Sequence, residues 1–416
     1  MFVNYGLAIF LTPYLITKLG DEIYSLWLLS FSIISYLSLS NLGFGNVFLV
    51  ELPKKIGKRG EEEVFFNTFF FSYLSFSLLS FIAFIGIYHL FDSFFKMSNN
   101  SLEVARRVLP IFFGIFLLQF FQGLFDSIVY VSDKLFLKNA IETFKVIIIG
   151  CFTYILLHLG YGIYEVALLN LFVQLLAFML MAILARKEMK YSISINKFDI
   201  TLFKESLSPS WHYFIFILCS QVIFYSDTWL ISGLAGVKYV AAYALMYRLV
   251  DVFVKAVFKI ADAKHPKILA LCAREDYNAL KQLHWKLQRL NFVITFPIAA
   301  ALAFAGIYIL QVWLGKALVF DQTILTIFCL LFILHTVGHV SALFVLALGI
   351  HRVTSRATVL EAASNLLLSF LFYKQFGILG IALGTLLSNL CVSFWFVPYQ
   401  FLTYINSKIT SSRGLS

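Results

Sequence analysis

Charged residues are scarce in this sequence of 416 residues. They make up 13% of the chain and hydrophobic residues make up 61%, whereas a soluble domain has roughly 25% charged residues. Apolar stretches of about twenty residues recur from end to end, and each is long enough to cross a hydrocarbon core of about 30 Å. This composition excludes a soluble domain of any size and predicts a protein that crosses a membrane many times.

The sequence also lacks the motifs of common catalytic and cofactor sites. Its five cysteines are scattered, with neither a disulfide framework nor the spacing of a zinc site. It has no glycine-rich phosphate loop, no His-Glu-x-x-His motif and no serine nucleophile elbow. We therefore expect neither an enzyme nor a resident cofactor. The net charge of +10 is explained by basic cytoplasmic loops, so no nucleic-acid partner is expected.

The apolar runs predict an all-α fold with about twelve transmembrane helices, because the strands of a β-barrel would alternate over about ten residues. A basic segment at 261–289 is expected to be a cytoplasmic linker. Its apolar residues between Tyr277 and Leu287 follow helical spacing, which predicts an amphipathic helix on the inner leaflet. The expected transmembrane helices are 2–18, 23–52, 64–91, 108–131, 139–159, 163–185, 207–233, 237–260, 290–314, 322–350, 357–376 and 378–405.

The distribution of Lys and Arg predicts the orientation. With both termini in the cytoplasm, 22 of the 32 basic residues fall on the cytoplasmic side and seven on the opposite side. Cytoplasmic loops carry such an excess because positive charge resists translocation. The same bias favours an even number of crossings, so we expect both termini to be cytoplasmic.

Two pairs of similar segments indicate an internal duplication. YLITKLG at Tyr14–Gly20 is echoed by WLISGLA at Trp229–Ala235, and GIYEVAL at Gly162–Leu168 by GILGIAL at Gly377–Leu383. Both pairs have an offset of 215 residues. The expected domains are a six-helix lobe at 1–185, a cytoplasmic linker at 186–206 and a second six-helix lobe at 207–416, related as parallel repeats.

One predicted helix carries a charged face. Arg248, Asp251, Lys255, Lys259 and Asp262 follow one another at intervals of three or four residues. Exposure of the Arg248 charge to lipid would cost several kcal/mol, so we expect this side of the helix to line an aqueous cavity. Arg248, Lys255 and Asp251 are the expected contacts of an anionic substrate, with Arg248 suited to phosphate. The alternative is an internal ladder of ion pairs.

A second basic position lies in the first half of the chain. Lys145, in the fifth predicted helix, could add a positive charge to the same anion site. The alternative is that its side chain reaches the membrane interface.

Four oxygen-bearing residues form a second expected site. Asp227 lies in the seventh predicted helix, Glu361 and Asn365 lie one turn apart in the eleventh, and Thr385 lies in the twelfth. Such oxygens suit sodium, and a carboxylate in low dielectric can also carry a proton. The alternative is that Asp227 pairs with a neighbouring helix or reaches the outer headgroup region.

Five motifs carry a resemblance to a known family. They are TPYLITKLG at Thr12–Gly20, YSLWLLSFSI at Tyr24–Ile33, LSNLGFGN at Leu39–Asn46, the Ser226–Leu249 segment and GILGIALGTLLSN at Gly377–Asn389. They resemble the polysaccharide-repeat (O-antigen or capsule, Wzx-type) flippases of the multidrug/oligosaccharidyl-lipid/polysaccharide exporter superfamily. The sequence departs from the related lipid II flippases in its first two helices, which lack their arginines.

The resemblance implies a fold and a function. It implies two MATE-like lobes around a cationic cavity, Arg248 at that cavity, and a sodium site near Asp227, Glu361, Asn365 and Thr385. The expected function is flipping of undecaprenyl-pyrophosphate-linked oligosaccharides by alternating access, coupled to a sodium or proton gradient. The protein would be a monomer in the bacterial inner membrane, surrounded by membrane lipids, beside a polysaccharide polymerase and a chain-length regulator. The alternatives are a cation-coupled multidrug exporter and a scaffold without transport activity.

Overall fold

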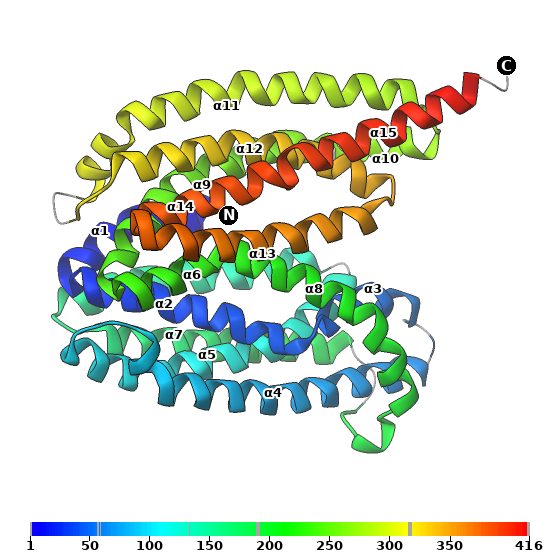
Figure 1. The fold of residues 1–416 in the computed structure, drawn as a ribbon. Coiled ribbons are helices and arrows are strands. Elements are labelled where there is room, and N and C mark those ends of the chain that lie inside the picture. Colours follow the sequence, from blue (N-terminus) through cyan, green and yellow to red (C-terminus); the bar gives the residue numbers. More distant parts are fainter. Residues whose placement is uncertain are drawn as a thin grey trace. The chain divides into compact units, whose positions relative to one another are not determined.

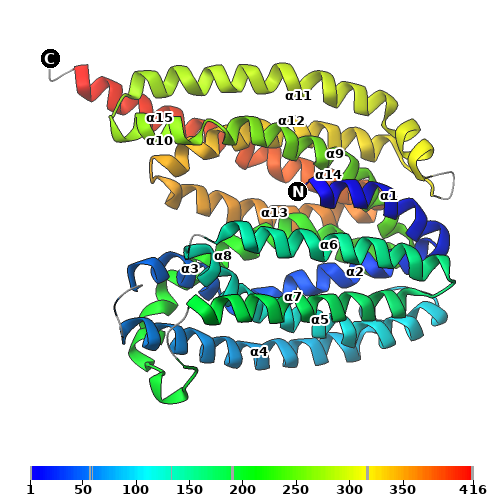
Figure 2. The same cartoon turned by 180° about the vertical axis from the view of Figure 1, so that it is seen from behind.

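The computed structural model describes residues 2–55, 58, 60–132, 134–188, 192–314 and 318–413. Over these residues the secondary structure consists of helices joined by short turns, without a strand (Figures 1 and 2). All five cysteines lie within the described residues and are free. The chain divides into two compact units, Met1–Gln221 with Ser232–Val240, and Val222–Ile231 with Ala241–Ser416.

The first unit is built on long helices. Within it, α5 packs against α7, α6 packs against α7, and α1 packs against α6. Helix α8 begins in this unit, and its last turns belong to the second unit. The helices are α1 (Phe2–Leu19), α2 (Asp21–Leu37), η1 (Ser38–Asn41), α3 (Phe44–Lys55), α4 (Glu61–Phe94), α5 (Asn99–Val131), α6 (Leu135–His158), α7 (Ile163–Glu188), η2 (Ile195–Lys197), α8 (Ile200–Leu230), the π-helical turn η3 (Ile231–Ala235) and η4 (Val237–Tyr239).

The second unit contains the remaining helices. Its closest pair is α13 with α14, while α12 packs against α11, α14 and α15 (Figure 1). An N-cap fixes the start of α12, because the Asp321 carboxylate accepts hydrogen bonds from the backbone of Thr323 and Ile324. The helices are α9 (Val240–Asp262), α10 (His265–Ala273), α11 (Tyr277–Leu314), α12 (Gln322–Ala347), α13 (His351–Phe376), α14 (Ile378–Cys391) and α15 (Ser393–Arg413).

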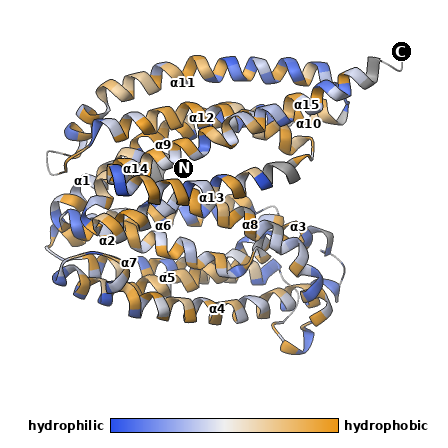
Figure 3. Cartoon of the chain, in the orientation of Figure 1, coloured by the Kyte–Doolittle hydropathy of each residue, from blue (hydrophilic) through white to orange (hydrophobic). Residues whose placement is uncertain are grey.

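Hydrophobic residues run along most of these helices, and hydrophilic residues gather toward helix ends (Figure 3). A helix satisfies its own backbone hydrogen bonds, which a membrane-spanning segment must do. By length and composition, eight described helices can span a membrane, or nine if the bent pair Tyr213–Ile223 and Tyr225–Ala235 forms one span. The protein is therefore a multi-pass membrane protein. The twelve crossings and the orientation of the termini stay predictions, since α9, with its charged face, and α13 are not among these spans.

The second expected helix, 23–52, is not continuous. It consists of α2, the 3₁₀ turn η1 and α3. Leu42 and Gly43 adopt positive φ angles of 50° and 80°. Gly43 also passes so close to α8 that an added Cβ would lie 2.3 Å from the Ser210 carbonyl oxygen. The apolar sequence continues through this break and gives no sign of it, because the break results from packing of Gly43 against the backbone of α8.

The linker expected at 186–206 folds onto the first unit. The Asn67 side chain of α4 donates to the Ser192 carbonyl and accepts from the Ser194 amide at 2.7 Å. The Asp199 amide donates to the Thr68 hydroxyl at 3.0 Å. Helix α8 already begins at Ile200. The predicted domain boundary therefore lies in a segment that packs against α4. Residues 189–191 of this segment lie outside the described residues.

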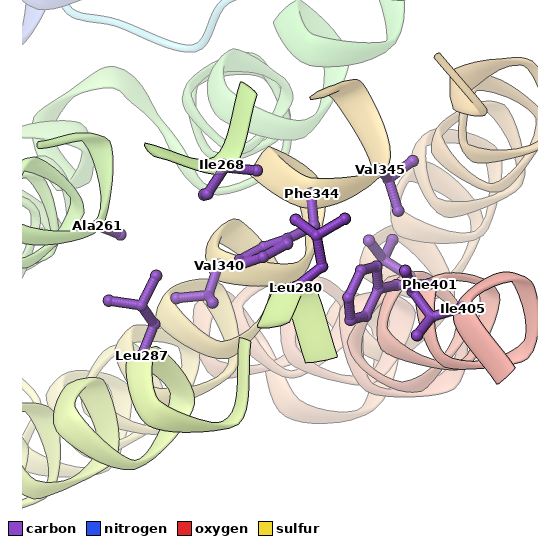
Figure 4. Close-up of a cluster of buried hydrophobic side chains, with 10 residues drawn as sticks. Ala261, Ile268, Leu280, Leu287, Val340, Phe344, Val345, Phe401 and Ile405 are labelled. Atoms are coloured by element: carbon purple, nitrogen blue, oxygen red, sulfur yellow. The ribbon is translucent and has the colours of Figure 1, made fainter. Parts of the chain in front are cut away.

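The prediction of an amphipathic surface helix between Tyr277 and Leu287 is wrong. These residues are the first turns of α11, which continues to Leu314. Leu280 and Leu287 are buried in a core with residues of α9, α10, α12 and α15, including Phe344 and Phe401 (Figure 4). The apolar face of this segment therefore packs against neighbouring helices and does not face lipid.

The two echoed segments fall at similar helix boundaries. Tyr14–Gly20 contains the end of α1, and Trp229–Ala235 contains the end of α8 and its π-helical turn. Gly162 directly precedes α7, and Gly377 directly precedes α14. This correspondence agrees with duplication, and the division into two parallel six-helix lobes stays a prediction.

Candidate functional site

Two closely packed helices of the second unit position the candidate ion site. Helices α13 and α14 run antiparallel, and the Ser369 hydroxyl donates to the Ile381 carbonyl at 3.1 Å. Glycines allow this approach. A Cβ at Gly380 would lie 2.2 Å from the Phe372 carbonyl oxygen, and one at Gly384 would lie 2.4 Å from the Ser369 nitrogen. Two small residues four positions apart in the sequence allow two helices to pack this closely.

We expect Gly384→Ala to destabilise the second unit. The added methyl would collide with the Ser369 backbone, and such overpacking costs about 1–3 kcal/mol or more. Thermal unfolding of the purified protein in detergent measures the effect as a lower melting temperature. Gly338→Ala in α12 is the matched control, because nothing lies within 4 Å of its Cβ position. Equal melting temperatures for the two variants would contradict the close-packing account.

Asp227 lies in a buried hydrogen-bond network at the end of α8. Asp227 is 9% exposed. The Tyr243 hydroxyl of α9 donates to the carboxylate at 2.5 Å, and the Thr385 hydroxyl of α14 lies 3.3 Å from the same oxygen. Thr385 in turn accepts from the Asn365 amide at 2.9 Å. Three of the four residues expected at an ion site are thus joined directly by hydrogen bonds.

Glu361 lies one helical turn from Asn365 and has different partners. Its carboxylate accepts from the Asn389 amide at 2.7 Å and from the Ser393 hydroxyl. The pairs Asn365–Thr385 and Glu361–Asn389 are therefore successive rungs between α13 and α14. The half-buried His335 of α12 lies within electrostatic reach of Glu361.

The Asp227 carboxylate has polar partners but no cationic one. Among the described residues, no Lys, Arg or His side chain forms a salt bridge with it. It accepts hydrogen bonds from the hydroxyl groups of Tyr243 and Thr385. A buried ionised carboxylate is costly unless a cation or a proton compensates its charge. The arrangement therefore suits binding of a small hard cation through oxygen atoms, or protonation of Asp227.

Two ion pairs divide the charged face of α9. Lys255 lies 2.6 Å from the Asp251 carboxylate, and Lys259 lies 3.0 Å from Asp262. Asp262 also contacts His339 of α12 at 2.8 Å. Arg248 is half-buried and, within the described residues, has neither a hydrogen bond nor an ion pair. The face is thus a partial ladder that leaves the Arg248 guanidinium available to an anion.

Lys145 belongs to a polar network in the first unit. It pairs with Glu142 at 2.6 Å and donates to Gln174 at 3.3 Å. Gln122, which is 4% exposed, donates to Glu142 at 2.9 Å. The Lys145 charge is therefore balanced inside α5, α6 and α7, and its expected contact with substrate stays a prediction.

Sequence reasoning did not place four residues at the candidate ion site: Ser226, Tyr243, Asn389 and Ser393. Asn389 could have been found, because it follows Thr385 by four residues on α14 and shares its face. Ser226 precedes Asp227 directly, and it donates to Asn365 at 3.2 Å. Tyr243 is on a different helix from Asp227, and the spacing of the two residues in the sequence does not predict their contact.

Comparison with known families identifies the chain's relatives. The profile of a family described as "Polysaccharide biosynthesis protein" matches residues 1–268. The chain belongs to this family. The resemblance of its motifs to polysaccharide-repeat flippases is thereby confirmed at the level of the family. Comparison with curated proteins gives no significant match.

Solved structures of membrane transporters and of a lipid flippase share the fold. An inward-facing multidrug resistance MATE-family transporter of the MOP superfamily matches with a TM-score of 0.77 and 14% identity, over 99% of this chain and 96% of that one. The lipid II flippase MurJ, inward closed, matches with a TM-score of 0.74 and 17% identity, over 98% and 89%. A MOP transporter from Pyrococcus furiosus matches with a TM-score of 0.63 and 15% identity, over 98% and 94%. This polysaccharide biosynthesis protein has a MATE- and MurJ-like helical fold.

Proposed function

We propose that the protein flips undecaprenyl-pyrophosphate-linked oligosaccharide repeat units across the bacterial inner membrane by alternating access. Membership of the polysaccharide biosynthesis family supports a sugar-containing substrate, and the fold shared with a lipid II flippase supports a lipid-linked one. The observation that carries the proposal is Arg248, a half-buried cation without a protein partner among the described residues. The protein acts as a transporter and performs no catalysis.

Arg248 is the proposed pyrophosphate contact. In a low-dielectric setting a guanidinium without an anion is costly, whereas one that binds phosphate through two N–H groups is stabilised. Lys255 lies two turns further along α9 and pairs with Asp251. An arriving pyrophosphate would compete with Asp251 for Lys255, so Asp251 sets how strongly the site attracts anions. Lys145 is a weaker candidate because Glu142 already balances its charge.

A sodium ion or a proton at Asp227 is the proposed driving partner. Asp227, Thr385 and Asn365 supply oxygen atoms within one hydrogen-bonded network, and Glu361 supplies a second carboxylate on the same face of α13 as Asn365. Occupation of Asp227 by a cation would remove the electrostatic cost of its buried charge. An ion gradient could thereby favour one conformation of the transporter over another.

The buried Asp227 also supports a second candidate, a cation-coupled multidrug exporter. The neighbour with a TM-score of 0.77 is a multidrug resistance transporter. A cationic drug would be repelled by an unpaired Arg248, whereas pyrophosphate would be attracted to it. This charge favours flipping over drug export.

Deletion of the gene in its host tests the function. We expect loss of surface polysaccharide and accumulation of the lipid-linked repeat unit on the cytoplasmic face, while sensitivity to ethidium stays unchanged. Extraction of lipid-linked sugars, with a membrane-impermeant probe for the outer face, measures this distribution. Raised ethidium sensitivity with normal polysaccharide would instead support drug export. Unassembled repeat units on the outer face would indicate a scaffold that acts after flipping.

A further inference from the structure

A basic groove lies on the first turns of α11, and none of the residues proposed to handle substrate or ion lines it. Its volume is about 610 Å³. Lys286 and Arg289 are exposed and form no ion pair within the described part of the chain. Lys281 is half-buried, and its ammonium donates to Asn406 of α15 at 2.8 Å. The lining residues are Asn278, Lys281, Gln282, Trp285, Lys286 and Arg289.

The opposite face of the same turns fixes the direction in which this groove opens. Leu280 is fully buried and Leu287 is 2% exposed, both in the core shared with α10, α12 and α15 (Figure 4). His284 is also buried, and it contacts the Ser341 hydroxyl at 3.0 Å. Because that side is covered by protein, the basic residues lie on the outward side of α11.

The outward side of α11 becomes apolar directly after the groove. Phe292, Val293 and Phe296 are 51%, 67% and 53% exposed, and they continue the helical face of Arg289. Further along, Phe304 is 90% exposed. Helix α11 is one of the candidate spans, so this apolar side is suited to acyl chains. The groove therefore lies where the acyl-chain region ends and headgroups begin. Figure 3 shows the corresponding hydrophilic end of α11 beside α10.

We propose that this groove binds the headgroup of an anionic phospholipid. The phosphodiester would lie between Lys286 and Arg289, with Lys281 held at its edge by Asn406. Trp285, which is 47% exposed, would lie at the interface between acyl chains and headgroup, where indole rings are favoured. The acyl chains would then extend along Phe292 and Phe296. The predicted topology assigns this lipid to the inner leaflet, whose surface carries anionic lipids.

The exposed position of the groove favours a bilayer phospholipid over the pyrophosphate-linked substrate. The apolar surface that adjoins the groove is exposed along the whole span of α11, so a bilayer lipid reaches it without entering the helix bundle. This site does not depend on Arg248 or on the proposed flipping function, so either proposal can fail without the other.

Native mass spectrometry of the full chain in detergent tests the site. Dioleoylphosphatidylglycerol and dioleoylphosphatidylcholine are titrated separately against the parent, Lys286→Gln/Arg289→Gln and Lys267→Gln/Arg274→Gln. The last variant removes the same charge from exposed positions outside the groove. We expect the parent and this control to bind phosphatidylglycerol about 30-fold more tightly than the groove variant, as two surface cations would provide. Phosphatidylcholine binding should be equal in all three.

Two results would overturn the assignment. One is a groove variant that keeps the parent's preference for phosphatidylglycerol while its folding is confirmed by size-exclusion chromatography. The other is displacement of bound phosphatidylglycerol by equimolar undecaprenyl pyrophosphate in the parent, because the groove would then belong to the lipid-linked substrate.

Discussion

Arg248→Ala abolishes surface polysaccharide in a complementation assay while the protein remains inserted and abundant. The arginine has no partner among the described residues, so its removal leaves no protein group unpaired and should not disturb folding. Truncating one side of a desolvated charge pair costs about 2–5 kcal/mol, or roughly 30-fold or more in affinity for the anion. Quantification of surface polysaccharide and of the protein by immunoblot measures both effects.

Two further variants make this expectation specific. Arg248→Lys keeps the charge but loses the planar fork, so it should restore only part of the activity. Arg274→Ala removes an exposed guanidinium at the end of α10 and should keep full activity. Full complementation by Arg248→Ala would remove this residue from the substrate site.

Asp227→Asn removes the dependence of transport on the ion gradient. The amide keeps the shape of the side chain and its contacts with Tyr243 and Thr385, but it has neither the negative charge nor a titratable proton. Translocation in proteoliposomes, with and without an imposed sodium or pH gradient, measures the effect. The parent should be accelerated by one of these gradients and the variant by neither. An unchanged gradient response would exclude Asp227 from coupling.

Stability gives a second readout for the same residue. In sodium-free buffer the parent carries a buried carboxylate without a cationic partner, so Asp227→Asn should melt at a higher temperature than the parent. Added sodium should raise the melting temperature of the parent and not that of the variant, if sodium binds the folded state at Asp227. Glu103→Gln is the control, because Glu103 is an exposed carboxylate paired with Arg107. It should respond to sodium as the parent does.

The helical fold follows from the sequence because hydrophobic length is a strong local signal. Helices α4, α5, α6, α7 and α12 lie close to their expected ranges. The break between α2 and α3 could not be found in this way, because it depends on contact between Gly43 and the backbone of α8. The start of α11 was missed for a related reason. The residues from Tyr277 to Leu287 are apolar on one side whether that side faces lipid or protein, and only the neighbouring helices decide which.

The candidate ion site was predictable where spacing along one helix reveals a shared face. Glu361 and Asn365 are four residues apart and do lie on successive rungs against α14. Tyr243 and Ser393 could not be inferred, because their contacts join separate helices through tertiary packing. On α9 the sequence showed all five charges, but their spacing did not decide that Asp251 pairs with Lys255 and Asp262 with Lys259. Because Asp251 pairs with Lys255, Arg248 is left without a partner among the described residues.

Translocation by the purified protein is the most direct test of the central claim. Proteoliposomes would contain the parent and a fluorescent undecaprenyl-pyrophosphate-linked oligosaccharide, and the fraction accessible to an impermeant quencher would be followed with time. We expect rapid exchange between leaflets for the parent, accelerated by an ion gradient, and only the rate of empty vesicles for Arg248→Ala. Equal rates for the parent and for empty vesicles, with correctly folded and inserted protein, would contradict the account.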